Sequence, residues 1–291
     1  MDNSETSERS IIAIVGTGLI GCSMAEGLRD ISSEIIGVDN NTGHLQEALS
    51  RGWIDRSMSL EKAAGYANII ILSVPVDASI QLLPRILELI APQSTVIDAG
   101  SIKGAVCRIA QDHAKRKQFV AAHPMAGLAV SGPDASDSRL FRNKKVIICE
   151  KEKSSEKALK KASLIFDNLG MDIVYMDPDL HDLCVARVSH LPQVLAYSLS
   201  AFTGGEDKHN EPMLNIASTG YESATRLASS PAEVWIPVFQ NNRVNLSESL
   251  DELISSLSGL RDMIKDGGWK SLEDHIKKAN KSRQLFMSVY K

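Results

Sequence analysis

The stretch AIVGTGLIG, residues 13–21, sets three glycines between an apolar run and a segment with helical periodicity. In a strand–turn–helix unit the first of them, Gly16, permits a tight turn, and the second, Gly18, lets a ligand approach the backbone. The third, Gly21, allows the helix to pack closely on the strand. The pattern G-x-G-x-x-G in this setting predicts a dinucleotide-binding site in an α/β fold.

The residues around this turn indicate the kind of dinucleotide. The helix that begins at Leu19 and Ile20 directs its amino end, where unpaired N–H groups gather, at the pyrophosphate. The next predicted strand, residues 34–39, ends in Asp39, at the interval of about 20 residues typical of a carboxylate that binds the adenosine ribose. A carboxylate repels a 2′-phosphate, and residues 40–42 contain no Arg or Lys, so we expect NAD rather than NADP.

Short apolar segments alternate with helical patterns from residue 10 to about residue 177. Segments that are β-branched and apolar on both faces are typical of buried parallel strands. They are SIIAIVG (10–16), EIIGVD (34–39), NIIILSVP (68–75), STVIDAG (94–100), QFVAAHP (118–124) and KVIICE (145–150). We therefore predict an α/β fold, with a doubly wound, mostly parallel Rossmann-type sheet, in a dinucleotide-binding domain of residues 10–177.

The remainder, residues 178–291, shows no pattern of a buried strand and predicts a C-terminal all-helical domain. Asp177, followed by a proline, has the features of a helix N-cap, and so does Ser230, also followed by a proline. Residues 244–264 repeat Leu and Ile at helical spacing and predict a long amphipathic helix. Its apolar face serves either packing within the chain or a dimer interface.

The composition is that of an ordinary globular protein. Of 291 residues, 43% are hydrophobic and 23% charged, and the formal net charge of -4 offers no basic field for nucleic acid. Residues 1–9 are polar, which predicts a disordered tail and not a signal peptide, and no apolar run is long enough to span a bilayer, so we expect a cytoplasmic protein without a membrane partner.

The cysteines and histidines do not predict a metal site. Cys22, Cys107, Cys149 and Cys184 lie far apart in the sequence, and His, Cys, Asp and Glu are nowhere grouped at ligand spacing. We expect free thiols and no bound metal. Any chemistry would then depend on an organic cofactor.

Three further predicted strands end in polar or conformationally special residues. In a doubly wound sheet the carboxyl ends of the strands bind the ligands. The apolar segment of residues 68–75 ends in Ser73, Val74 and Pro75, which are candidate cofactor contacts, although Pro75 also suits the simple termination of a strand.

The other two strand ends carry candidate substrate groups. Ser101 and Lys103 follow one strand at a strand-to-helix turn, and His123 ends the next. We expect Lys103 to bind substrate. Ser101 suits either helix capping or substrate contact, and His123 either a core position or a catalytic one, with the strand edge favouring catalysis.

The helical domain contributes two histidines and an arginine. His181 and His190 are nine residues apart, which on an ideal helix places them on opposite faces, so we expect them not to share a site and His181 to be structural. Pro192 cannot donate to the carbonyl four residues earlier, which predicts a bend beside His190 that suits the wall of a cleft. Arg226 stands among small and apolar residues, where it either pairs with an internal carboxylate or binds an anionic substrate.

Six motifs occur along the chain in the order in which prephenate and arogenate dehydrogenases contain them, and the sequence resembles that family from about residue 11 to residue 244. The motifs are GTGLIG (16–21), LSVPV (72–76), DAGSIKG (98–104), HPMAG (123–127), HDLCVARVSHLP (181–192) and TGYESATRLASSPAEVW (219–235). The resemblance implies a dinucleotide domain followed by a helical dimerisation domain, and hence a homodimer. It also implies oxidation of prephenate by NAD to 4-hydroxyphenylpyruvate and CO2, or of arogenate to tyrosine, in tyrosine biosynthesis.

The resemblance also implies roles for individual residues. His123 contacts the ring hydroxyl of the substrate and takes its proton, Ser101 orients that hydroxyl, Arg226 anchors a carboxylate and His190 positions the substrate from the helical wall. Since a neutral imidazole is needed to accept a proton, activity is expected to fall at low pH.

The chain departs from the family pattern in two places. Leu128 and Ala129 stand where many members have a Thr-Glu pair, and Gln193 replaces the last histidine of a frequent SHLPH motif. Both departures leave the choice between a keto and an amino side chain open, with prephenate favoured.

Two other interpretations are open. Dehydrogenases of the β-hydroxyacid type share the two-domain plan and carry a lysine shortly before an Asn pair; PVFQNN (237–242) has the pair without the lysine. The second interpretation is a dinucleotide sensor that has lost catalysis. The presence of the candidate catalytic and substrate-binding residues His123, Ser101 and Arg226 argues against it.

Overall fold

The computed structural model describes residues 9–204 and 210–289. Residues 1–8 of the predicted N-terminal tail lie outside this part of the chain, so the tail stays a prediction. By internal contacts the chain divides into two compact units, Met1–Arg243 and Val244–Lys291. The first unit includes the sheet and the helices that directly follow it. The sequence instead predicts a boundary after residue 177.

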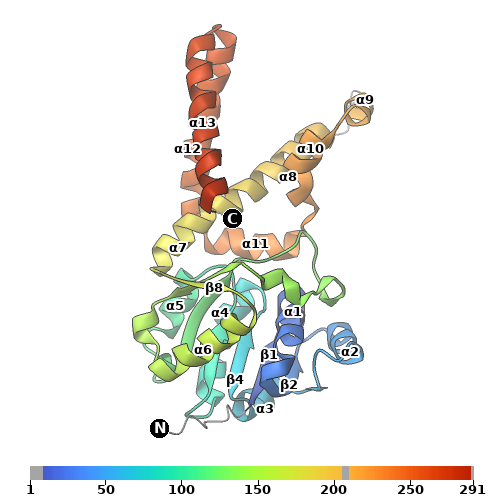
Figure 1. Ribbon diagram of the computed structural model, residues 1–291, viewed down its shortest axis with the longest axis vertical. Coiled ribbons are helices and arrows are strands. Elements are labelled where there is room, and N and C mark those ends of the chain that lie inside the picture. Colours follow the sequence, from blue (N-terminus) through green and yellow to red (C-terminus); the bar gives the residue numbers. More distant parts are fainter. Residues whose placement is uncertain (1–8, 205–209, 290–291) are drawn as a thin grey trace. The chain divides into compact units, whose positions relative to one another are not determined.

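A sheet flanked by helices forms the centre of the first unit (Figure 1). It has eight strands in the order β3-β2-β1-β4-β5-β6-β7-β8. All neighbouring strands are parallel except β6 and β7. The strands are β1 (Ser10–Val15), β2 (Ser32–Val38), β3 (Arg56–Ser57), β4 (Ile69–Leu72), β5 (Thr95–Asp98), β6 (Phe119–Pro124), β7 (Lys145–Cys149) and β8 (Asp172–Met176). The predicted doubly wound, mostly parallel sheet is confirmed, and β3 and β8 are additional edge strands.

Two apolar layers cover the sheet, one on each face. α1, α2 and α6 pack on one face and α3, α4 and α5 on the other. The buried side chains of the six inner strands alternate between the two layers. These helices are α1 (Leu19–Gly27), α2 (Thr42–Ser50), α3 (Leu60–Tyr66), α4 (Val76–Leu89), α5 (Gly104–Ala110) and α6 (Glu156–Asn168). Because both faces are covered, the strands carry apolar residues on both sides, as the sequence indicates.

The chain changes from sheet to helices at Asp177. Its side chain accepts hydrogen bonds from the N–H groups of Asp179 and Leu180, and Pro178 is the first helical residue, as predicted. The helices after this point are α7 (Pro178–Val185), the π turn η6 (Ala186–His190), α8 (Leu191–Gly204), α9 (Asn210–Asn215), α10 (Thr219–Thr225), η7 (Arg226–Ser229) and α11 (Ala232–Asn241).

The second unit contains α12 (Arg243–Lys265), apart from its first residue, and α13 (Trp269–Val289). α12 confirms the long amphipathic helix predicted over residues 244–264. Among the described helices, none combines the length and apolarity needed to cross a membrane.

One predicted helix start is wrong by one residue. The N-cap of α11 is Pro231 and not Ser230, and no side chain caps the helix. The Ser230 carbonyl instead accepts a hydrogen bond from the Tyr197 hydroxyl at 2.7 Å. The local sequence around Ser230 does not predict this hydrogen bond, because its donor, Tyr197, lies on α8, 33 residues earlier in the chain.

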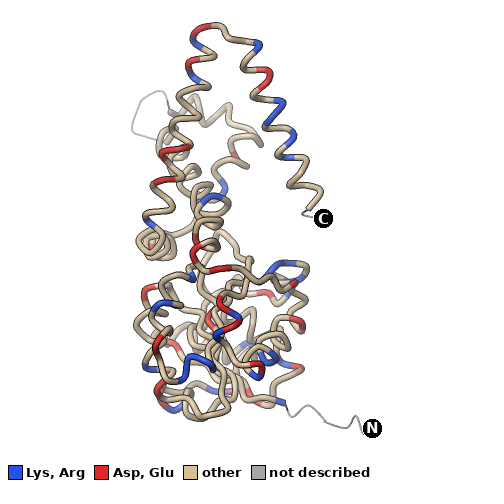
Figure 2. The backbone as a smooth tube through the Cα atoms, turned by 90° about the vertical axis from the view of Figure 1, so that its left-hand side faces the viewer, with Lys and Arg blue, Asp and Glu red and all other residues tan. Residues whose placement is uncertain are grey.

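Charges are mixed along the chain. Figure 2 shows Lys and Arg interspersed with Asp and Glu along the tube.

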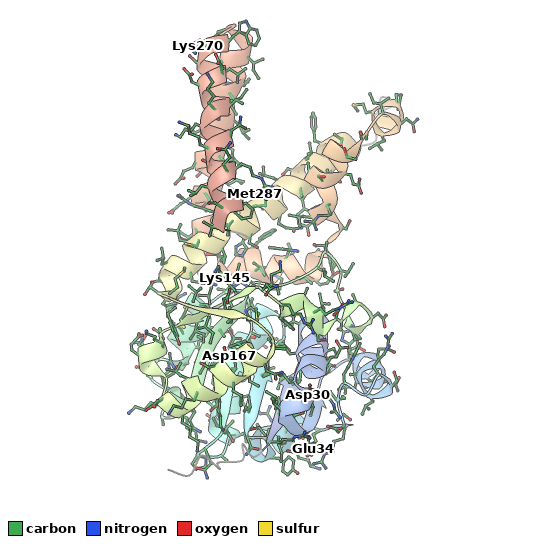
Figure 3. The ribbon with its side chains drawn as sticks, viewed as in Figure 1. Asp30, Glu34, Lys145, Asp167, Lys270 and Met287 are labelled. Carbon is green, nitrogen blue, oxygen red and sulfur yellow. The ribbon has the colours of Figure 1, made fainter. Side chains whose placement is uncertain are left out.

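Two labelled residues show where the carboxyl edge of the sheet lies. Figure 3 labels Lys145, at the start of the antiparallel strand β7, and Glu34, near the start of β2. These two residues mark opposite ends of the sheet, because β7 begins beside the end of β6. The end marked by Lys145 is the carboxyl edge of the parallel strands.

Candidate active site

The glycine turn after β1 has no room for side chains at two of its positions. Gly16 adopts φ +96°, and a Cβ built there would lie 2.5 Å from the Ser73 carbonyl oxygen. A Cβ on Gly21 would overlap the Gly16 carbonyl oxygen. Gly18 is the N-cap of α1, and no described atom lies within 4 Å of where its Cβ would be. The turn brings bare backbone and a helix amino end together, which suits a pyrophosphate.

Asp39 is fixed beside this turn. Its Oδ2 accepts hydrogen bonds from the Thr17 N–H at 2.7 Å and from the Thr17 hydroxyl at 3.0 Å, and its Oδ1 accepts one from the Asn41 N–H at 2.8 Å. The Asn41 side chain is itself occupied as the N-cap of α2. The carboxylate at the end of β2 is therefore held by a residue that lies between the first two glycines of the turn.

The end of β4 supports the turn from the other side. The Ser73 hydroxyl donates to the Gly16 carbonyl at 2.8 Å, so in this structure it binds the glycine turn. Val74 is half-buried against Gly16. Pro75 is the N-cap of α4 and lies three residues beyond Leu72, where β4 ends, so a role of Pro75 as a cofactor contact stays a prediction. Leu19 and Ile20 form the first turn of α1.

His123 lies near the end of β6, half-buried at the carboxyl edge. Its Nδ1 is 2.9 Å from Nε2 of His181, and the two rings meet edge to face at an interplanar angle of 73°. His181 is completely buried on α7, and its Nδ1 is 2.8 Å from Asp182 Oδ1. His123, His181 and Asp182 thus form one hydrogen-bonded chain.

Asp182 also caps α5. It accepts hydrogen bonds from the N–H groups of Lys103 and Gly104, both at 2.9 Å. The capping role that we considered for Ser101 is thereby filled from α7. Ser101 is half-buried, and its hydroxyl forms no hydrogen bond within the described residues. It follows β5 at the edge where β6 presents His123.

Lys103 is not where the prediction of substrate binding would place it. Its side chain is fully buried, its ammonium forms an ion pair with Asp98, and it donates to the Ala122 carbonyl at 2.6 Å. In this position Lys103 joins the ends of β5 and β6 from inside the protein. Substrate binding by this residue stays a prediction, which the position of the ammonium does not favour.

His190 is buried in the helical part of the same unit. The Asn242 amide nitrogen is 3.2 Å from its Nδ1 and also donates to the Asp182 carbonyl at 2.7 Å. The Asp182 carbonyl can only accept, so the Asn242 atom that contacts it is the amide nitrogen, a donor. Nδ1 of His190 therefore accepts from the same nitrogen, and the proton of the neutral ring lies on Nε2. Trp235 of α11 packs edge to face on the ring at 5.9 Å.

The expectation that His181 and His190 do not share a site is not met, because both lie near enough to His123 to lower its pKa and Asn242 links His190 to the carbonyl of Asp182, next to His181. The helix does not run regularly between them, because residues 186–190 form a π turn. One extra residue in a turn rotates the subsequent side chains by about 100° relative to an ideal α-helix. Pro192, which cannot donate a backbone hydrogen bond, lies just beyond the π turn. The sequence predicts a helix bend beside His190, and the structure has a π turn there.

The remaining candidates lie at the surface or in the helical part. Arg226 begins η7 and is exposed, so the internal carboxylate that we considered is not its partner in this structure. Leu128 is exposed in the loop after β6, and Ala129 is half-buried. Gln193 is buried and donates to the Leu227 carbonyl at 2.7 Å.

Comparisons with known proteins identify the family. The model of the prephenate dehydrogenase nucleotide-binding domain matches residues 24–175, and that of the prephenate dehydrogenase dimerization domain matches residues 177–278. The chain belongs to the prephenate dehydrogenase family. It is accordingly an oxidoreductase with a nucleotide-binding domain.

Individual members cover almost the whole chain. Prephenate dehydrogenase of Lactococcus lactis is 30% identical over 285 residues, which is 96% of this chain and 78% of that protein. Prephenate dehydrogenase of Aquifex aeolicus, solved with hydroxyphenyl propionate and NAD+, is 28% identical with a TM-score of 0.83 and covers 95% of this chain and 98% of that one. Arogenate dehydrogenase of Synechocystis is 27% identical with a TM-score of 0.78 and covers 95% of this chain and 99% of that one.

The surroundings of His123 and His190 lower the pKa of both imidazoles. Burial lowers the pKa of His123 well below the usual value of an imidazole, and the nearby His181, Lys103 and His190 lower it further. Burial also lowers the pKa of His190 to about 4, against a partial opposing effect of Asp182. Both imidazoles are therefore neutral at neutral pH, and a neutral imidazole can accept a proton.

Three residues of this arrangement were not predicted from the sequence. Asp182 and His181 were assigned no role at the site, although the HD pair at the start of the HDLCVARVSHLP motif was a usable signal. Asn242 was considered only as part of an Asn pair. The four cysteines are free, as predicted, and no group of metal-ligating side chains is found among the described residues.

Proposed function

We propose that this protein catalyses the NAD-dependent oxidative decarboxylation of prephenate to 4-hydroxyphenylpyruvate and CO2. The observation that carries the proposal is the neutral His123 at the carboxyl edge of a nucleotide-binding sheet of this family. The ring of prephenate bears a hydroxyl and a carboxylate. Loss of hydride from the carbon that bears the hydroxyl allows the carboxylate to leave as CO2 and the ring to become aromatic.

The residues around the glycine turn fit NAD. Gly16 and Gly21 are needed for steric reasons, Gly18 leaves the backbone open, and Asp39 offers a fixed carboxylate to a ribose diol. Since that carboxylate would repel a 2′-phosphate, the fit favours NAD over NADP. NAD, when bound, supplies the acceptor for the hydride.

The chain's own residues supply orientation and acid–base chemistry. His123 accepts the hydroxyl proton as the hydride leaves, and Ser101, with its hydroxyl unengaged within the described residues, orients the substrate hydroxyl. His190 carries its proton on Nε2 and can donate to the substrate from the helical part. Arg226 provides an exposed guanidinium for a substrate carboxylate.

Arogenate is the second candidate substrate, and the likeness to the Synechocystis arogenate dehydrogenase favours it. Arogenate differs from prephenate in an amino group at the side chain, away from the carbon that loses hydride. The proton acceptance by His123 is the same for both. The difference is therefore expected in KM more than in kcat.

A homodimer is part of the proposal. The match to a dimerization domain supports it, and so do large apolar side chains exposed on α12 and α13, among them Ile254, Trp269 and Leu285. A cytoplasmic location is also part of the proposal, because the reaction consumes NAD and a small charged metabolite.

NADH formation tests the proposal. Purified protein is incubated with prephenate or arogenate and with NAD or NADP, and the near-ultraviolet absorbance of the reduced cofactor is followed. We expect turnover with NAD and prephenate. A folded protein that binds NAD and oxidises neither compound would refute the enzyme assignment.

A further inference from the structure

We propose that His181 is a positioning residue that fixes the tautomer of His123, so that Nε2 of His123 presents its lone pair to the substrate hydroxyl. The inference deepens the proposed function and rests on it for its catalytic consequence. The hydrogen-bonded chain Asp182–His181–His123 carries the argument, since each member determines which nitrogen of the next one holds the proton.

Asp182 starts the chain as an acceptor. Both of its oxygens accept backbone hydrogen bonds, Oδ1 from Lys103 and Oδ2 from Gly104, at the amino end of α5. Burial raises the pKa of this carboxyl, but the hydrogen bonds from His181, Lys103 and Gly104 outweigh that effect and hold the pKa below its usual value. An ionised carboxylate has no proton to donate.

His181 must therefore donate to Asp182. Its Nδ1 lies 2.8 Å from Asp182 Oδ1, and this bond requires a proton on Nδ1. Burial lowers the pKa of His181 more than its bond to Asp182 raises it, so the ring is neutral and carries only that one proton. Nε2 of His181 is left with a lone pair.

His123 must in turn donate to His181. Its Nδ1 lies 2.9 Å from Nε2 of His181, and two lone pairs at this distance would repel. The proton of the neutral His123 ring therefore lies on Nδ1, and Nε2 is the acceptor. The opposite tautomer would point N–H at the substrate hydroxyl and could not take its proton.

The same chain stabilises the product of proton transfer. When Nε2 of His123 accepts the hydroxyl proton, the ring becomes cationic and its Nδ1–H bond to His181 strengthens, while the negative Asp182 lies one ring away. His181 keeps its proton on Nδ1 throughout, so protons and charges balance with one transfer from substrate to His123. The role resembles that of the carboxylate that orients histidine in a hydrolase triad, with an imidazole inserted between them.

Two amide substitutions at His181 separate its two bonds. In His181→Asn the amide reaches the place of Nδ1 and can still donate to Asp182, but nothing accepts from His123. In His181→Gln the amide oxygen reaches the region of Nε2 and can accept from His123. We expect His181→Asn to lower kcat by about 10²-fold with little change in KM, and His181→Gln to recover most of the loss. Equal rates for both variants would overturn the proposal.

A measurement without substrate reports the tautomer itself. In the NAD complex of the wild-type protein, nitrogen NMR of selectively labelled histidine is expected to show His123 protonated at Nδ1 and unprotonated at Nε2. In His181→Asn we expect both tautomers of His123. A proton on Nε2 of wild-type His123 would overturn the inference even if neither variant folds. Failure of the wild-type enzyme to oxidise prephenate or arogenate would refute the proposed function and leave this result standing.

Discussion

Replacing Lys103 with methionine is expected to destabilise the first unit strongly, because it leaves Asp98 buried without its partner. Both side chains are fully buried, and Oδ1 of Asp98 already has no hydrogen-bond partner within the described residues. Removing one partner of a buried ion pair costs about 3–5 kcal/mol. At about 2–4 °C per kcal/mol for a unit of this size, the melting temperature should fall by roughly 6–20 °C.

Urea unfolding monitored by circular dichroism measures this loss. The double variant Asp98→Leu/Lys103→Met should recover most of the stability, because apolar side chains of similar volume often replace a buried ion pair without loss. Lys145→Met is the matched control, an exposed lysine at the same edge of the sheet, with an expected change within about 0.5 kcal/mol. A stable Lys103→Met protein with a raised KM would refute this reasoning and support the substrate-binding role predicted from sequence.

Three further predictions concern catalysis and cofactor choice. Because burial lowers the pKa of His123 and its neutral form is the active one, kcat/KM should hold through pH 6.5, about the usual value of an imidazole, and fall only at lower pH; a decline centred at or above that value would contradict the pKa direction. Asp39→Asn keeps an acceptor for Thr17 but removes the charge, so NAD affinity should fall by roughly 10–100-fold while NADP binding improves, as measured by fluorescence titration. Arg226→Ala should raise the KM for substrate and leave the free energy of unfolding within about 0.5 kcal/mol of wild type, and an unchanged KM would remove Arg226 from the site.

Local sequence patterns are sufficient to predict the positions of the strands and of the glycine turn in the nucleotide-binding domain. The glycine spacing, the apolar runs and the position of Asp39 each depend on short-range geometry, and the structure places all three as expected. His123 was located for a similar reason, because the end of a predicted parallel strand fixes the edge on which its side chain lies.

Long-range contacts account for the features that local patterns did not predict. The capping of α5 by Asp182 joins residues 79 positions apart, and the burial of Lys103 depends on the ion pair with Asp98. Ideal helix geometry places His181 and His190 on opposite faces, but the π turn of residues 186–190 changes the direction of the side chains.

The most direct test of the account is NADH formation from prephenate by the wild-type protein beside His123→Asn, with NAD binding measured for both. We predict turnover by the wild type and a loss of about 10²–10⁴-fold in kcat for His123→Asn, with NAD affinity unchanged. A His123→Asn protein that oxidises prephenate at the wild-type rate would contradict the assignment of His123 as the proton acceptor.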